Sequence, residues 1–155
     1  MKILQMKPWR TAFLILGAVI VLLSGCSSNG SGGTCDQSTT HTVEWRFSGS
    51  FDQLVSVATT WVKASGEFSD PADPKYAHID PANGTLLTET LPGCTGASIN
   101  ITMLDGGADD IVTLSNVTLS IYVDGALADS VTLNGSYSES TILPADGALE
   151  VVVGE

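Results

Sequence analysis

The chain has 155 residues, a length that allows one domain rather than two. Its residues are 43% hydrophobic, which excludes a disordered chain, and only 15% of them are charged. Six basic residues stand against 17 acidic ones, for a net charge of −11, which argues against nucleic-acid binding because phosphate contacts need Lys and Arg.

The first 25 residues have the pattern of a secretory signal peptide. Lys2, Lys7 and Arg10 precede an unbroken apolar run over residues 12–23, and the segment contains no acid. A positive start followed by about a dozen apolar residues is typical of such signals. The run is short for a membrane-spanning helix, which needs about 20 residues. An uncleaved N-terminal anchor helix is the alternative interpretation.

Four residues at the end of this segment favour the signal peptide: Leu23, Ser24, Gly25 and Cys26. They resemble the lipobox of bacterial lipoproteins, in which an aliphatic residue and two small residues precede a cysteine. The resemblance, which covers residues 1–26, implies that the Cys26 thiol carries diacylglycerol and that a peptidase cleaves between Gly25 and Cys26. It implies a membrane partner through this lipid and a location in the bacterial cell envelope.

The next segment predicts a short tether. Residues 27–34, together with the acylated Cys26, are rich in Gly and Ser and contain no aliphatic or aromatic residue, which is typical of a flexible linker. In the lipoprotein family an Asp after the acylated cysteine holds the protein at the inner membrane, so Ser27 implies the outer membrane if the species has one. Cleavage would leave three basic residues against all 17 acids, a balance of −14. The lipid, rather than a basic patch, would then hold the protein at the membrane.

From Cys35 onward the hydrophobic period is two residues, which predicts β-strands. Residues 41–48 place Val43, Trp45 and Phe47 on one face. Similar stripes follow: Phe51, Val55, Val57, Thr59 and Trp61; residues 85–91; Ala97, Ile99, Ile101 and Met103; Val117, Leu119, Ile121 and Val123; and a closing strand over residues 149–153.

Two dipeptides predict tight hairpin turns. Asp124-Gly125 and Asn134-Gly135 both suit a type I′ turn, which requires positive φ at both central residues. Residues 117–143 are therefore predicted to form a three-stranded antiparallel meander. Seven to nine short strands without a helical stripe predict an all-β antiparallel sandwich of the immunoglobulin-like kind over residues 35–155, with a small β-barrel as the alternative.

The cysteine count predicts one disulfide. The chain has three cysteines, and acylation of Cys26 would leave Cys35 and Cys94. An even remainder in an exported domain is typical of a bridge, which here would close a loop of about 60 residues. Two free thiols are the alternative.

The sequence contains no recognisable catalytic or nucleotide-binding motif. His41 and His78 stand far apart and lack the short ligand spacings of a zinc site, so both are interpreted as surface histidines. There is no Gly-x-Ser-x-Gly elbow, no P-loop and no Gly-x-Gly-x-x-Gly pattern. We therefore expect a protein that is not an enzyme and that needs no cofactor.

Two acidic loops are the remaining candidates for a binding site. Calcium takes six to eight oxygen ligands, which loops rich in Asp, Asn and Gly can supply. Neither loop has the EF-hand spacing, and Asp-Pro and Asp-Gly are also ordinary turn dipeptides, so turns are the preferred interpretation. The candidate calcium ligands are Asp70, Asp73, Asp80, Asp105, Asp109 and Asp110.

Three patterns of the domain carry a second resemblance: Val43-x-Trp45-x-Phe47-x-Gly49, the Leu91-Pro92 step, and Ile121-Tyr122-Val123-Asp124-Gly125. The domain is similar to small immunoglobulin-like envelope domains, and in outline to the accessory domains of mycobacterial lipid exporters. That family has no catalytic residues, which implies an accessory role. The leading hypothesis is a non-catalytic, lipid-anchored envelope protein whose acidic sandwich binds a protein or glycan. A calcium- or small-ligand-binding module accessory to envelope transport is the alternative.

Overall fold

The computed structural model describes residues 35–52, 55–102, 111–138 and 141–155. All regular secondary structure in these ranges is β-strand. The predicted all-β sandwich is confirmed, and because neither sheet closes on itself the barrel alternative is excluded. The strands are β1 (Thr40–Phe51), β2 (Ser56–Val62), β3 (Gly84–Pro92), β4 (Gly96–Thr102), β5 (Ile111–Val123), β6 (Ala126–Ser138), β7 (Ile142–Leu143) and β8 (Leu149–Val152).

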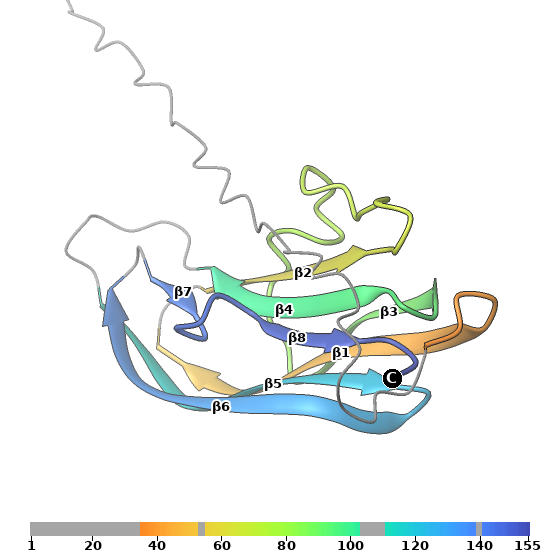
Figure 1. Cartoon of the computed structure of the whole chain (residues 1–155). Coiled ribbons are helices and arrows are strands. Elements are labelled where there is room, and N and C mark those ends of the chain that lie inside the picture. Colours follow the sequence, from red (N-terminus) through yellow and green to blue (C-terminus); the bar gives the residue numbers. More distant parts are fainter. Residues whose placement is uncertain (1–34, 53–54, 103–110, 139–140) are drawn as a thin grey trace, which may run out of the picture. The chain divides into compact units, whose positions relative to one another are not determined.

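Two antiparallel sheets form the sandwich (Figure 1). The first has the order β3-β1-β5-β6. In the second, β4 pairs with β2 along one edge and with the short strands β7 and β8 along the other. If β7 and β8 are taken as one interrupted strand, the sheets have the sizes of a constant-type immunoglobulin sandwich, although the strands within them follow a different order.

The strand β1 shows why this sequence folds into two layers. Val43, Trp45 and Phe47 are buried, while the residues between them are not, as the alternation predicts. The Trp45 indole N–H donates a hydrogen bond to the backbone oxygen of Ser98 in β4, at 2.9 Å. An inner strand of each sheet thus contributes to one hydrogen bond across the core, and the large buried indole keeps its polar atom satisfied.

The second predicted stripe is only partly confirmed. Val55, Val57 and Thr59 are buried as predicted. Phe51, which was assigned to the same strand, instead ends β1, where its ring packs edge to face against that of Phe47 with the centroids 6.0 Å apart. In the stripe that contains Met103, Ala97, Ile99 and Ile101 are buried as predicted, and Met103 lies outside the described residues.

The first predicted hairpin turn is confirmed. Asp124 and Gly125 have φ angles of 51° and 79°, positive at both central residues as a type I′ turn requires, and they join β5 to β6. The Asp124 backbone N–H donates to the Thr42 oxygen at 2.8 Å. The turn is therefore bonded to the start of β1.

The second predicted turn is wrong, and with it the three-stranded meander over residues 117–143. Asn134-Gly135 lies inside β6, opposite a bulge in β5 that contains Asn116. The Asn134 side-chain oxygen accepts a hydrogen bond from the Asn116 backbone N–H at 2.7 Å. The dipeptide therefore accommodates a bulge in one long strand pair, and the chain after β6 continues to the other sheet.

Residues 63–83 form a long excursion between β2 and β3 that covers one side of the sandwich (Figure 1). Val57 and Ile79 exchange two backbone hydrogen bonds of 3.0 and 2.9 Å, and the Thr59 N–H donates to the Tyr76 oxygen at 2.7 Å. The Tyr76 hydroxyl in turn donates to the Glu89 carboxylate of β3 at 3.0 Å. On this side, the chain therefore bonds to the edge strand of each sheet.

Candidate functional site

The proposed anchor lies outside the described residues. This applies to Leu23, Ser24, Gly25 and Cys26 and to the tether over residues 27–34. In the part that the structure describes, no helix is long and apolar enough to cross a membrane. The candidate sites below therefore belong to the β domain.

Cys35 and Cys94 form the predicted disulfide, with their Cα atoms 5.3 Å apart. Backbone hydrogen bonds surround Cys94: its N–H donates to the Val153 oxygen at 2.8 Å, and the Val153 N–H donates to the Thr95 oxygen at 2.9 Å. The bridge thus joins the start of the domain to the β3–β4 turn, which is itself bonded to the chain after β8. In the chain-entropy model such a loop is worth about 4 kcal/mol at most.

Two of the candidate calcium ligands act as turn residues. Asp70 Oδ1 accepts a hydrogen bond from the Ala72 N–H at 2.8 Å, and Asp73 Oδ1 accepts one from the Lys75 N–H at 2.9 Å. This is the turn chemistry that the sequence favoured for them. Among the described residues, which include Asp80, no three His, Cys, Asp or Glu side chains are grouped as a metal site would require. The remaining candidates lie outside the described residues: Asp105, Asp109 and Asp110.

The three basic residues after Cys26 are each paired with a carboxylate and lie over an aromatic ring. Hydrogen bonding to Glu44 raises the pKa of Arg46 and lowers that of Glu44, and hydrogen bonding to Glu89 raises the pKa of Lys75. The ion pairs are Arg46–Glu44, Lys63–Glu67 and Lys75–Glu89, and the rings are those of Tyr122, Trp61 and Tyr76. All of the domain's Lys and Arg side chains are therefore engaged, and carboxylates dominate its charge.

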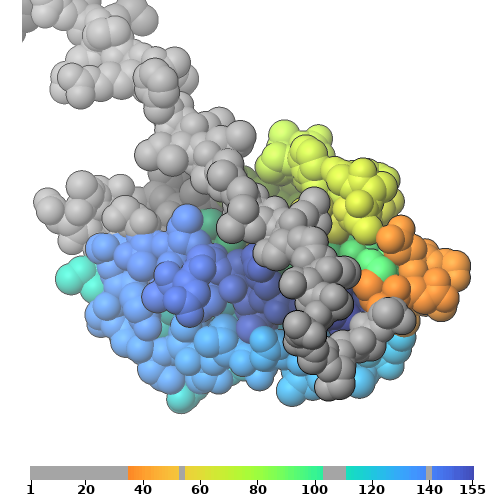
Figure 2. All heavy atoms as spheres, viewed as in Figure 1, coloured from red at the N-terminus to blue at the C-terminus, as the bar shows by residue number. Residues whose placement is uncertain are grey.

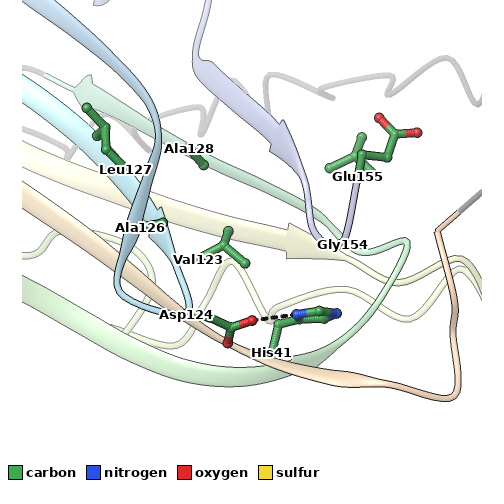
Figure 3. Close-up of a pocket in the computed structure, with 9 residues that line it drawn as sticks. His41, Val123, Asp124, Ala126, Leu127, Ala128, Gly154 and Glu155 are labelled. Carbon is green, nitrogen blue, oxygen red and sulfur yellow. Dashed lines mark hydrogen bonds and ion pairs between the residues drawn. The ribbon is translucent and has the colours of Figure 1, made fainter. Parts of the chain in front are cut away.

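An open groove of about 410 Å³ lies between the start of β1, the β5–β6 turn and the chain after β8 (Figure 3). Most of its lining is apolar, with an imidazole and two carboxylates among the hydrophobic side chains. Figure 3 shows Leu127 and Glu155 on opposite sides of the groove and the His41–Asp124 contact at one end. The lining residues are His41, Val123, Asp124, Ala126, Leu127, Ala128, Val152, Gly154 and Glu155.

His41 and Asp124 are in contact at one end of this groove. His41 Nδ1 lies 2.7 Å from Asp124 Oδ2, and the Thr42 backbone N–H donates to Asp124 Oδ1 at 2.8 Å. The hydrogen bond with His41, and then that from Thr42, lowers the pKa of Asp124, and partial burial opposes the shift only in part. These contacts of the Asp124 carboxylate hold the hairpin turn against the start of β1.

Thr39 extends this pair to a row of hydroxyl, imidazole and carboxylate. Its Oγ1 lies 3.1 Å from His41 Nε2. Hydrolases use such a row to activate a hydroxyl, which requires the hydroxyl proton to point at the imidazole. The Thr39 hydroxyl instead donates to the Asp36 backbone oxygen at 2.7 Å. The Thr39 hydroxyl proton is therefore engaged with the backbone at the start of the domain.

No protein-family model, curated protein or solved structure matches the chain.

The groove joins residues that lie far apart in the sequence. His41 was interpreted as a surface histidine and Asp124 as a turn residue, and 83 positions separate them. They meet because β1 and β5 pair with Val43 opposite Val123. Alternation indicates which face of a strand is buried, but it does not indicate which strands are neighbours.

Proposed function

We propose that this chain is a non-catalytic, lipid-anchored protein of the bacterial cell envelope, at the outer membrane if the species has one. One observation carries the proposal. It is the order of the segments along the chain: a basic and apolar segment, a lipobox ending at Cys26, a Gly/Ser tether, and a disulfide-closed β domain beginning at Cys35. A disulfide persists in an oxidising compartment, which supports export of the domain.

The surface of the domain supports a role in binding a protein or glycan partner. Its basic side chains are engaged with its own carboxylates, so anionic lipid head groups would repel the domain. The eight tether residues span about 15 Å as a flexible chain. The domain would thus stay close to the membrane through its lipid while its surface remains open to a partner.

Metabolic labelling with a fatty-acid analogue tests the anchor. The wild-type chain should carry the label, and Cys26→Ser should lose it because no thiol remains for the thioether. The matched control is the double variant Cys35→Ser with Cys94→Ser, which removes the other two cysteines and should keep the label. Undiminished label on Cys26→Ser would refute the lipoprotein proposal.

A further inference from the structure

The edge strands on the two sides of the sandwich differ in the contacts that they make. On one side the backbone of the excursion over residues 63–83 bonds to the edge of β2, and its Tyr76 side chain bonds to the Glu89 side chain of β3. On the other side lie β6 and β8, and no described strand pairs with the outer edge of either. A strand in an antiparallel sheet uses only half of its backbone N–H and C=O groups for one neighbour. Within β6, the Ser130 N–H bonds to the Asp129 carboxylate, and the Asn134 and Ser138 oxygens accept bonds from Tyr137 and Thr141. The remaining outer backbone groups, to which no described strand bonds, are the ones that this edge offers.

Large apolar side chains are exposed where these two edges approach each other. The side chains of Leu127 in β6 and Val152 in β8 are 54% and 44% exposed, and both line the groove. Figure 2 shows the surface of β6, in lighter blue, beside the darker blue segment that holds β8. Single exposed apolar residues are ordinary, but these two line one depression.

A bulge shapes the β6 rim of the groove. Ile121 pairs with Asp129 and Tyr122 with Leu127, so Ala128 is an extra residue in β6. Bulges redirect side chains and interrupt pairing, and they occur often beside binding sites. The irregularity thus lies at the point where β6 borders the groove.

Charge indicates what kind of partner fits. Asp124, which is 55% exposed, and Glu155 place carboxylates on the groove, whereas the domain's Lys and Arg side chains are engaged elsewhere. A second copy of so acidic a domain would be repelled. A partner that carries basic side chains would be attracted, and attraction between opposite charges also selects among partners.

We propose that this groove and the adjacent edge of β6 bind an extended segment of a partner protein, in which apolar residues alternate and a Lys or Arg flanks them. The inference rests on the proposed function and names its partner class. The segment adds a strand to β6 through main-chain hydrogen bonds, which is a known mode of peptide recognition. Its apolar side chains cover Leu127 and Val152, and its basic side chain meets the groove carboxylates.

Peptide binding to the full chain in detergent tests the proposal. The probe is a fluorescent seven-residue peptide in which valine and threonine alternate between two terminal lysines. One control replaces both lysines by glutamate, and a second keeps the lysines but places proline at the centre, where it cannot pair as a strand. Both controls should bind at least about tenfold more weakly than the probe. Equal binding of the proline peptide would show attraction of charge alone and overturn strand addition.

Two variants of the protein locate the site. Leu127→Ser and Val152→Ser should each weaken probe binding by about tenfold, because each removes an apolar contact on the groove. The matched control is Phe68→Ser, which removes a 61% exposed side chain from the excursion on the other side, and it should change affinity by less than about twofold. Circular dichroism of each variant verifies folding. Equal effects of all three variants would place the site elsewhere.

Two further measurements separate the remaining outcomes. Sedimentation that reveals a dimer, lost in Leu127→Ser, would assign the edge to a second copy and overturn the proposal. Fatty-acid labelling of Cys26 is independent of peptide binding. If the wild-type chain binds the probe peptide but carries no fatty-acid label, the anchor proposal alone is refuted. If the chain carries the label but does not bind the probe, the groove proposal alone is refuted.

Discussion

Asp124 makes contacts through its backbone and through both carboxylate oxygens. Its N–H donates to the Thr42 oxygen, its Oδ1 accepts from the Thr42 N–H, and its Oδ2 contacts His41 Nδ1. Donors that point at the ionised carboxylate stabilise the charged form, which is why its pKa lies below the ordinary value of 3.8. One turn residue thus holds together two ends of the domain that are distant in the sequence.

The pH dependence of stability should therefore include a contribution from Asp124. A carboxyl whose pKa is lowered by folding stabilises the fold fully above its ordinary pKa, and this stabilisation is lost as the pH falls through the lowered value. Asp124→Asn keeps the shape but removes the charge. The variant should melt below the wild type at about pH 5, and the difference should shrink towards about pH 2.5. Thermal melts of both proteins across this range measure it.

Asp129→Asn is the matched control for this experiment. Asp129 lies on the same hairpin, and its carboxylate accepts a bond from the N–H of the adjacent Ser130 rather than from another strand. Its melting temperature should follow that of the wild type at both ends of the pH range. If the Asp124→Asn difference stayed constant with pH, the loss would be one of shape and the charge would play no part.

At the scale of the strand, Gly49 lies where the backbones of β1 and β5 come close together. The pairing of the two strands shifts between Ser48 and Ser50, and Gly49 has a φ of 124°. A Cβ at Gly49 would lie 2.6 Å from the Asn116 oxygen and 2.6 Å from the Val117 Cα. Both atoms belong to the backbone and cannot rotate away, so glycine is required for shape as well as for conformation.

Gly49→Ala and Gly84→Ala should separate these two requirements. Gly84 has nearly the same φ, 120°, but a Cβ there would meet no atom within 4 Å. Gly84→Ala should cost about 1 kcal/mol of unfolding free energy from backbone strain, and Gly49→Ala about 3 kcal/mol because overpacking is added. Urea denaturation of both variants measures the difference. Equal costs would mean that β1 and β5 move apart easily.

The strands themselves were predictable, but their arrangement was less so. The stripe of Val117, Leu119 and Ile121 is buried as alternation predicts, since period two depends on the local backbone alone. The turn predicted at Asn134-Gly135 was wrong because a dipeptide that tolerates positive φ suits a bulge as well as a turn. The two cases differ only in whether β6 continues to pair with β5 beyond the dipeptide, as it does here. The pairing of Ile79 with Val57 of β2 could not be predicted, because it is a long-range contact.

The candidate site was less predictable than the fold for the same reason. The Cys35–Cys94 bridge followed from counting, because two cysteines allow one pairing. The His41–Asp124 contact required knowing that β1 and β5 are neighbours, and the groove required knowing that the start of β6 and the end of β8 border one depression. These are properties of the strand order, which alternation does not encode.

For the molecule as a whole, the excess of acids raises the question whether they bind a cation. The described carboxylates are dispersed: several accept hydrogen bonds from their own backbone, others pair with Lys, Arg or His, and no three acidic, His or Cys side chains form a group within the described ranges. Dispersed exposed charges interact with salt through screening, which depends on ionic strength and little on the identity of the ion.

Thermal melts with calcium, magnesium or EDTA at fixed ionic strength should therefore give the same midpoint for calcium as for magnesium. A chelated ion would add about 2.7 kcal/mol at a hundredfold excess over its Kd. In a domain of this size that would raise the midpoint by about 5–10 °C with calcium alone. Such a shift would contradict the prediction and favour a calcium-ordered binding loop. The double variants Asp70→Asn with Asp73→Asn, and Asp109→Asn with Asp110→Asn, would then locate the ion, since the pair that supplies its ligands would abolish the shift.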